Sequence, residues 1–200
     1  ERVGIVWIYK GSSQGLLNAA GNPTVTSIRQ GKNGTPGISE EGDQFGYSLV
    51  TGQFMGASYD DLAIGSIGET LSGKAWAGAV VTVPGSSTGL NTKNSNSLRR
   101  GKKGIPGDPE SYDRFGASLA VGDVTGDSHL DLVVGAPGEN QIGAVHVFTG
   151  TAKNPNTSES TVIPGKDLGL LPSSLSTLNS TSTGSSALFG WSLALAEVTG

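Results

Sequence analysis

The sequence repeats itself, and this repetition limits the possible folds more than any other feature. A block of the form Phe-Gly-x-Ser-Leu begins at Phe45, Phe115 and Phe189. A second block, Asp-Leu followed by two apolar residues and a glycine, occupies 61–65 and 131–135. A third block, in which a glycine precedes small and branched apolar residues, occupies 4–6, 78–80 and 143–145. Because these blocks keep their order and nearly their spacing, the chain is a tandem repeat of about 70 residues per unit.

Each unit contains four short segments with the pattern of β-strands. Residues 115–123 alternate, with Phe115, Ala117, Leu119 and Val121 on one face. Residues 130–135 are almost continuously apolar, as expected of a strand covered on both faces, and 143–149 form a third run. The fourth, 97–101, is polar and basic, which suits an exposed edge strand. The 32 glycines favour many tight turns, so we predict an all-β fold, a β-propeller of four-stranded antiparallel blades.

Composition excludes several classes of function. A net charge of −4, with only 15% charged residues, leaves no basic field for nucleic acid, and no apolar stretch is long enough to insert into a membrane. The absence of cysteine excludes disulfides, thiolate metal sites and cysteine nucleophiles. Only two histidines, His129 and His146, are available, which disfavours a zinc site and a serine–histidine triad. The sequence therefore leans away from an enzyme and leaves that question open.

The motifs at the two ends of one loop resemble a known family. Phe115-Gly116 and Gly135-Ala136-Pro137 bracket residues 123–131. This arrangement resembles the FG-GAP repeat of integrin α-chain β-propellers and of their secreted bacterial relatives, and the glycine-rich and serine/threonine-rich sequence around it resembles actinobacterial members. The resemblance implies an extracellular propeller with calcium in the loop between the first two strands of a blade.

The loop has a calcium-type pattern of oxygen ligands. Side-chain oxygens stand at loop positions one, three, five and nine, with a backbone carbonyl at position seven: Asp123, Thr125, Asp127, Asp131 and, for the carbonyl, His129. This spacing resembles the first nine positions of an EF-hand loop, and an all-oxygen set favours Ca²⁺ over a transition metal. The alternative is a polar turn with solvated aspartates, and Thr125 and Ser128 both depart from the family's usual residues.

The repeats and their loops divide the chain. Residues 1–44 end one blade, 45–114 form a repeat with a degenerate metal loop, 115–188 form a repeat with an intact calcium loop, and 189–200 begin another repeat. In the degenerate loop Gln53, Met55 and Ala57 replace ligand positions, so we expect no metal there. About three blades do not close a ring. We therefore expect a larger ring of seven blades, completed by the same longer polypeptide or by another chain.

Other candidate residues are less specific. The connection from Glu69 to Gly78 is longer than its counterpart and carries Lys74 and Trp76, which predict contacts with a ligand unless Trp76 folds back onto its own blade. The basic residues Arg99, Arg100, Lys102 and Lys103 favour a solvated edge strand over a phosphate or acidic-glycan site. His146 on a strand face favours a structural role, and the acidic residues Asp108, Glu110 and Asp113 have no partner that spacing identifies. The role of the insertion at 170–186 cannot be interpreted from the sequence.

These observations favour a non-catalytic, calcium-stabilised, secreted propeller that binds a protein or glycan outside the cell. One alternative is the propeller portion of a secreted hydrolase or lyase, directed at phospholipids or polysaccharides, whose catalytic residues lie outside this chain. That alternative rests on resemblance alone. A purely structural or assembly role is the third possibility, favoured if another chain completes the ring.

Overall fold

A computed structural model describes residues 3–13, 15–18, 20–56, 58–102, 104–150, 161–164 and 188–195. Three features discussed above lie outside these ranges, namely Ala57, Lys103 and the insertion at 170–186, as do residues 196–200 of the last repeat. The described residues form an all-β structure, confirming the predicted fold class. Within them, no helix has the length and apolar character needed to cross a membrane.

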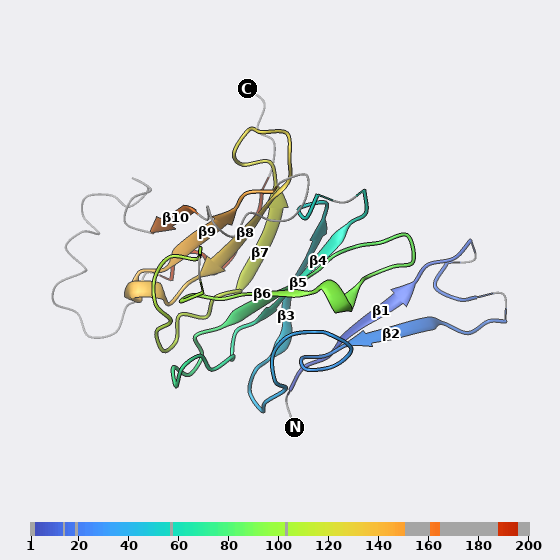
Figure 1. Cartoon of the computed structure of the whole chain (residues 1–200), viewed down its shortest axis with the longest axis horizontal. Coiled ribbons are helices and arrows are strands. Elements are labelled where there is room, and N and C mark those ends of the chain that lie inside the picture. Colours follow the sequence, from blue (N-terminus) through green and yellow to red (C-terminus); the bar gives the residue numbers. More distant parts are fainter. Residues whose placement is uncertain are drawn as a thin grey trace.

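Three antiparallel sheets follow one another along the chain (Figure 1). The first pairs β1 (Val6–Lys10) with β2 (Thr24–Ile28). The second is a meander of β3 (Phe45–Gly52), β4 (Asp61–Ser66), β5 (Ala79–Val83) and β6 (Asn96–Leu98), with the 3₁₀ turn η1 (Thr92–Asn94) before its last strand. The third is a meander of β7 (Ser118–Gly122), β8 (Asp131–Ala136), β9 (Ala144–Phe148) and β10 (Thr161–Pro164), with η2 (Glu139–Gln141) between β8 and β9. These four-stranded meanders are the blades.

The apolar strands are buried on both faces because each blade lies between neighbours. All six residues of β4 and of β8 are buried. Leu62 and Ile64 point from β4 toward the β1–β2 sheet, whereas Ala63 points toward the following blade. Side chains of successive strand residues alternate between faces, so a continuous apolar run serves two interfaces at once.

Two hydrophobic cores join the three sheets. The first inter-blade core packs the β1–β2 sheet against β3–β6 through Val6, Ile28, Phe45, Leu62, Ile64, Val81 and Val83. The second packs β3–β6 against β7–β10, and its largest side chains, Phe54, Phe115 and Phe148, are fully buried. A third cluster, on the far face of β7–β9, packs against Phe189 and Leu193. The same interface therefore recurs at each repeat.

The two glycine motifs of the repeat meet at these interfaces. A Cβ on Gly65 of β4 would lie 2.3 Å from the carbonyl oxygen of Gly116, and one on Gly135 of β8 would lie 2.0 Å from that of Gly190. Serine hydroxyls bond the same two carbonyls. The Ser48 hydroxyl donates to the Gly116 carbonyl at 2.6 Å, and the Ser118 hydroxyl donates to the Gly190 carbonyl at 2.7 Å. Glycine is needed because the backbone of the next repeat passes through the space of a side chain.

Candidate functional site

The predicted calcium loop joins β7 to β8, at the edge of the blade where Asp131 begins the strand. Asp131 is fully buried, and its carboxylate accepts hydrogen bonds from the amides of Val124, Thr125 and Gly150 at 2.9–3.0 Å. Asp131, at the end of the loop, therefore links the start of the loop to the segment that follows β9. This residue therefore has a structural function that is independent of any metal.

The other acidic residues of the loop are exposed and bind its backbone. The Asp123 carboxylate accepts the amides of Gly126, Asp127 and Ser128, at 2.7 to 3.2 Å. Asp127 accepts the amide of His129 at 2.9 Å, and the His129 ring lies 3.5 Å from the same carboxylate oxygen. In the described part of the chain, no three side chains of Asp, Glu, His or Cys converge as a preformed metal cluster.

The donor set nevertheless fits a hard cation. An ionised carboxylate has about four acceptor sites on its two oxygens. The hydrogen bonds found for Asp123, Asp127 and Asp131 leave acceptor capacity on each of them. Three carboxylates within nine residues repel one another, and a divalent cation removes that repulsion.

The degenerate loop provides a comparison within the same molecule. Asp61, the counterpart of Asp131, is fully buried and accepts the amides of Met55 and Gly85 at 2.7 and 2.9 Å. Burial raises the pKa of the Asp61 carboxyl, against the lowering effect of these amides. Since Asp61 makes the same bonds in a loop that lacks the other ligand positions, the aspartate at position nine is required by the blade itself.

Lys74 and Trp76 lie at the opposite edge of the sheet, in the connection between β4 and β5. Lys74 is exposed and closes a tight turn with Leu71, while Trp76 is half-buried with a φ of 59°. The Trp76 carbonyl accepts the amide of Arg114 at 2.9 Å, and the Arg114 guanidinium stacks on Trp191 at 5.4 Å. The backbone of the β4–β5 connection is thus bonded to the following repeat, next to the Arg114 and Trp191 side chains.

A buried polar cluster in the second inter-blade interface was missed by sequence reasoning. Arg100 forms ion pairs with Asp113 and with Glu139, and the second oxygen of Glu139 lies 2.6 Å from His146 Nε2. All four residues are at most 6% exposed. The interpretation of the basic segment as a solvated edge is therefore wrong for Arg100, although Arg99 is exposed. Burial raises the pKa of Asp113, opposed by the Glu110 amide and by Arg100.

The sequence contains a signal for this cluster that only alignment of the repeats brings out. Gln30, Asp43 and Glu69 occupy in the first interface the places of Arg100, Asp113 and Glu139. The amide of Glu40 binds Asp43, at 2.7 Å, as the amide of Glu110 binds Asp113 at 2.8 Å. An acidic pair that recurs in each repeat indicates a buried partner, because such carboxylates are costly to bury alone.

Comparison with known proteins agrees with this architecture. Residues 115–148 match the family model described as FG-GAP repeat. The chain belongs to the FG-GAP repeat β-propeller family. Integrin alpha-PS2 of Drosophila melanogaster is 34% identical over 64% of the chain, and integrin alpha-V of Gallus gallus is 29% identical over 76%. Phosphatidylinositol-glycan-specific phospholipase D of Mus musculus is 30% identical over 70%. The matched regions span only 9%, 15% and 16% of these relatives.

In this FG-GAP chain the phenylalanine–glycine motif of one repeat lies against the preceding blade, although the two motifs are separated in the sequence. The Phe115 amide binds the Ala77 carbonyl at 3.0 Å, and the Phe189 amide binds the Ile142 carbonyl at 3.2 Å. Each FG dipeptide thus continues the backbone pairing of the preceding blade, beside the glycine of that blade's second strand.

Proposed function

We propose that this FG-GAP propeller is a non-catalytic, calcium-stabilised module that binds a protein or glycan outside the cell. The recurring inter-blade packing of an integrin-like repeat carries this proposal. It is supported by the integrin alpha relatives, which are similar over about two thirds or more of the chain. The oxygen-rich loop and the exposed surface at the opposite edge provide two separate places for a cation and for a partner.

In the proposed calcium site, the side chains of Asp123, Thr125, Asp127 and Asp131 and the carbonyl of His129 hold the ion. Bound calcium supplies positive charge that neutralises the three carboxylates. Asp131 anchors the loop to β8 through its amide bonds, while Asp123 and Asp127 bind loop amides and keep acceptor capacity for the ion. The expected gain is a rigid β7–β8 loop and a more stable blade.

The calcium proposal is tested by thermal unfolding of the chain after EDTA treatment and dialysis, with and without added Ca²⁺. We expect Ca²⁺ to raise the melting temperature and direct calorimetric titration to give one site. Asp127→Asn keeps an acceptor for the His129 amide and removes one charge, so it should abolish most of the rise. Asp60→Asn, an exposed residue of the degenerate loop, is the matched control and should respond like the unchanged chain. A melt that neither EDTA nor Ca²⁺ alters refutes the site.

The partner surface is proposed at Lys74 and Trp76; in support, the Trp76 carbonyl accepts the Arg114 amide, so a second candidate anchor is near. Tryptophan and arginine are frequent anchors of protein interfaces, and an aromatic face also stacks on sugar rings. Immobilised panels of purified matrix proteins and of glycans identify the ligand class. Lys74→Ala and Trp76→Ala should each weaken the binding found, whereas Lys93→Ala, an exposed lysine at the other edge, should not. Binding that survives both substitutions unchanged places the partner elsewhere.

We further propose that additional blades cover the free faces of the described sheets. In β1, Val6 and Ile8 pack against the neighbouring blade, whereas Trp7 and Tyr9 on the other face are more than half exposed. The missing blades come from the same longer polypeptide or from another chain. The intact mass of the native protein under denaturing conditions distinguishes these two cases, since only the first gives a mass well above 20.2 kDa.

A second candidate function is the propeller portion of a secreted hydrolase or lyase. It is favoured by the similarity to phosphatidylinositol-glycan-specific phospholipase D over 70% of the chain. In that case the catalytic residues lie outside these 200 residues, and the native full-length protein should turn over a phospholipid or polysaccharide substrate. Binding of a partner without such turnover supports the first proposal instead.

A further inference from the structure

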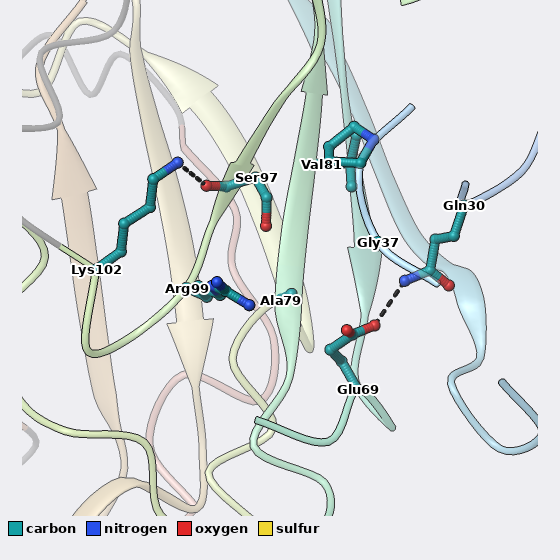
Figure 2. Close-up of a pocket in the computed structure, with 9 residues that line it drawn as sticks. Gln30, Gly37, Glu69, Ala79, Val81, Ser97, Arg99 and Lys102 are labelled. Carbon is teal, nitrogen blue, oxygen red and sulfur yellow. Dashed lines mark hydrogen bonds between the residues drawn. The ribbon is translucent and has the colours of Figure 1, made fainter. Parts of the chain in front are cut away.

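A cavity of about 180 Å³ lies in the first inter-blade interface, between the connection that follows β2 and the face of β5 and β6 (Figure 2). Polar and charged side chains line it together with apolar ones: Gln30, Pro36, Gly37, Glu69, Ala79, Val81, Ser97, Arg99 and Lys102. Glu69, which lines the cavity, follows the end of β4. The proposed calcium loop joins the opposite ends of the strands, so the cavity is separate from it.

The inner wall of the cavity presents hydrogen-bond acceptors. Gln30 is 2% exposed, and its Nε2 donates to Glu69 at 2.6 Å, as Figure 2 shows. Its Oε1 is buried without a hydrogen-bond partner in the described part of the chain. Gly37 leaves room for this amide, since a Cβ there would lie 2.9 Å from Nε2. The Glu69 carboxylate, whose side-chain hydrogen bond among the described residues comes from this neutral amide, favours a ligand with N–H donors and a positive charge.

The second inter-blade interface shows what occupies the same position when the chain fills it. Arg100 stands in place of Gln30, and His146 stands in place of Val81. Both contact Glu139, the counterpart of Glu69, at 3.2 and 2.6 Å. Gly107 accommodates the Arg100 guanidinium as Gly37 accommodates Gln30. The repeat therefore has a cation position against this carboxylate, and in the first interface no side chain of the described residues forms an ion pair there.

The outer part of the cavity carries the opposite charge. Arg99 is exposed at the rim, and Lys102 donates to the Asn96 side chain and the Ser97 carbonyl at 2.8 and 2.7 Å. Within the described ranges, neither cation has a carboxylate at ion-pair distance. Burial, followed by the nearby Arg99 charge, lowers the pKa of Lys102. Two cations at the rim favour a carboxylate on the ligand.

We propose that this cavity binds a small zwitterion, namely a free amino acid. Its ammonium group lies against Glu69, its carboxylate against Arg99 and Lys102, and its side chain against the apolar surface that Ala79 and Val81 of β5 form. A cavity of about 150 Å³ holds a benzene-sized molecule, so the available volume suits an amino acid of small or medium size. This inference goes beyond the proposed calcium and partner binding and does not depend on either.

Titration calorimetry with L-valine and with each of the other protein amino acids tests the proposal. We expect saturable binding of at least one of them. Two fragments of L-valine separate its charges: isobutylammonium lacks the carboxylate and isovalerate lacks the ammonium. Each fragment should bind at least about tenfold more weakly than the zwitterion, because each loses one set of charge-assisted hydrogen bonds. Absence of saturable binding by every amino acid refutes the proposal, as does a fragment that binds as tightly as L-valine.

Two variants assign the binding to this cavity. Glu69→Gln removes the negative charge at the inner wall, and Arg99→Gln removes a positive charge at the rim. Each should weaken binding about ten- to hundredfold. Arg29→Gln is the matched control because Arg29 is the exposed counterpart of Arg99 in the preceding repeat, and it should leave affinity unchanged. If Arg99→Gln, a rim substitution that spares the core, binds like the unchanged chain, the assignment is wrong.

Discussion

Replacement of Arg100 by glutamine tests how the blades are held together. Arg100 is 6% exposed and forms ion pairs with Asp113 and Glu139, which are themselves 0% and 4% exposed. Loss of one partner from a buried ion pair costs about 3–5 kcal/mol, because the remaining charge is left without compensation. The substitution reproduces the first interface, where Gln30 donates to Glu69 at 2.6 Å. A hydrogen bond of this kind recovers about 1 kcal/mol.

We therefore expect Arg100→Gln to lower the free energy of unfolding by about 2–4 kcal/mol and the melting temperature by about 5–15 °C. Urea unfolding followed by circular dichroism measures the first quantity and calorimetry the second. Arg99→Gln, next in the chain but exposed, should stay within about 0.5 kcal/mol of the unchanged protein.

The pH dependence of this effect is a second signature. Burial already raises the pKa of Asp113, and loss of the guanidinium removes an influence that lowers it. The folded variant then holds the Asp113 proton more tightly than the unfolded chain over a wider pH range. The deficit in stability should be smaller at about pH 5 than at pH 7. A loss equal to that of Arg99→Gln, or one independent of pH, refutes the view that Arg100 compensates buried carboxylates.

Three further predictions follow from the interfaces and buried carboxylates. Gly135→Ala should destabilise the chain by about 3 kcal/mol in urea unfolding, since the new Cβ meets the Gly190 backbone, whereas Gly11→Ala, with no atom within 4 Å, should be neutral. Asp61→Ala should cost about 2 kcal/mol by leaving two amides unpaired; an effect no larger than that of exposed Asp60→Ala contradicts this. In calcium-free buffer, the free energy of unfolding should rise as pH falls from 7 toward the ordinary carboxyl range. The reason is that burial raises the pKa of four carboxyls, so the folded state binds protons more tightly than the unfolded chain. A flat or opposite pH profile contradicts this. These four are Asp43, Asp61, Glu69 and Asp113.

The loop at 123–131 shows the limit of pattern-based prediction of a site. Spacing predicts oxygen ligands in it, yet the buried Asp131 bonds three amides, and its counterpart Asp61 bonds two amides in a loop without the other ligand positions. A carboxylate at a strand start satisfies backbone donors whether or not a cation is nearby. Sequence spacing does not separate these two functions of one residue.

The sequence by itself determined the repeat, the strand pattern and the faces that pack, because these depend on local periodicity and on glycine at places of close approach. Residues such as Leu62 and Ala63 alternate between two cores simply as neighbours on a strand. Only the tertiary structure decided the burial of Arg100, since its partner Asp113 lies in an irregular segment of the same repeat and its partner Glu139 comes from the following blade. The same holds for the cavity at Gln30 and Glu69. Whether a polar side chain is solvated or buried depends on what the neighbouring blade places against it, and spacing along one strand does not contain that information.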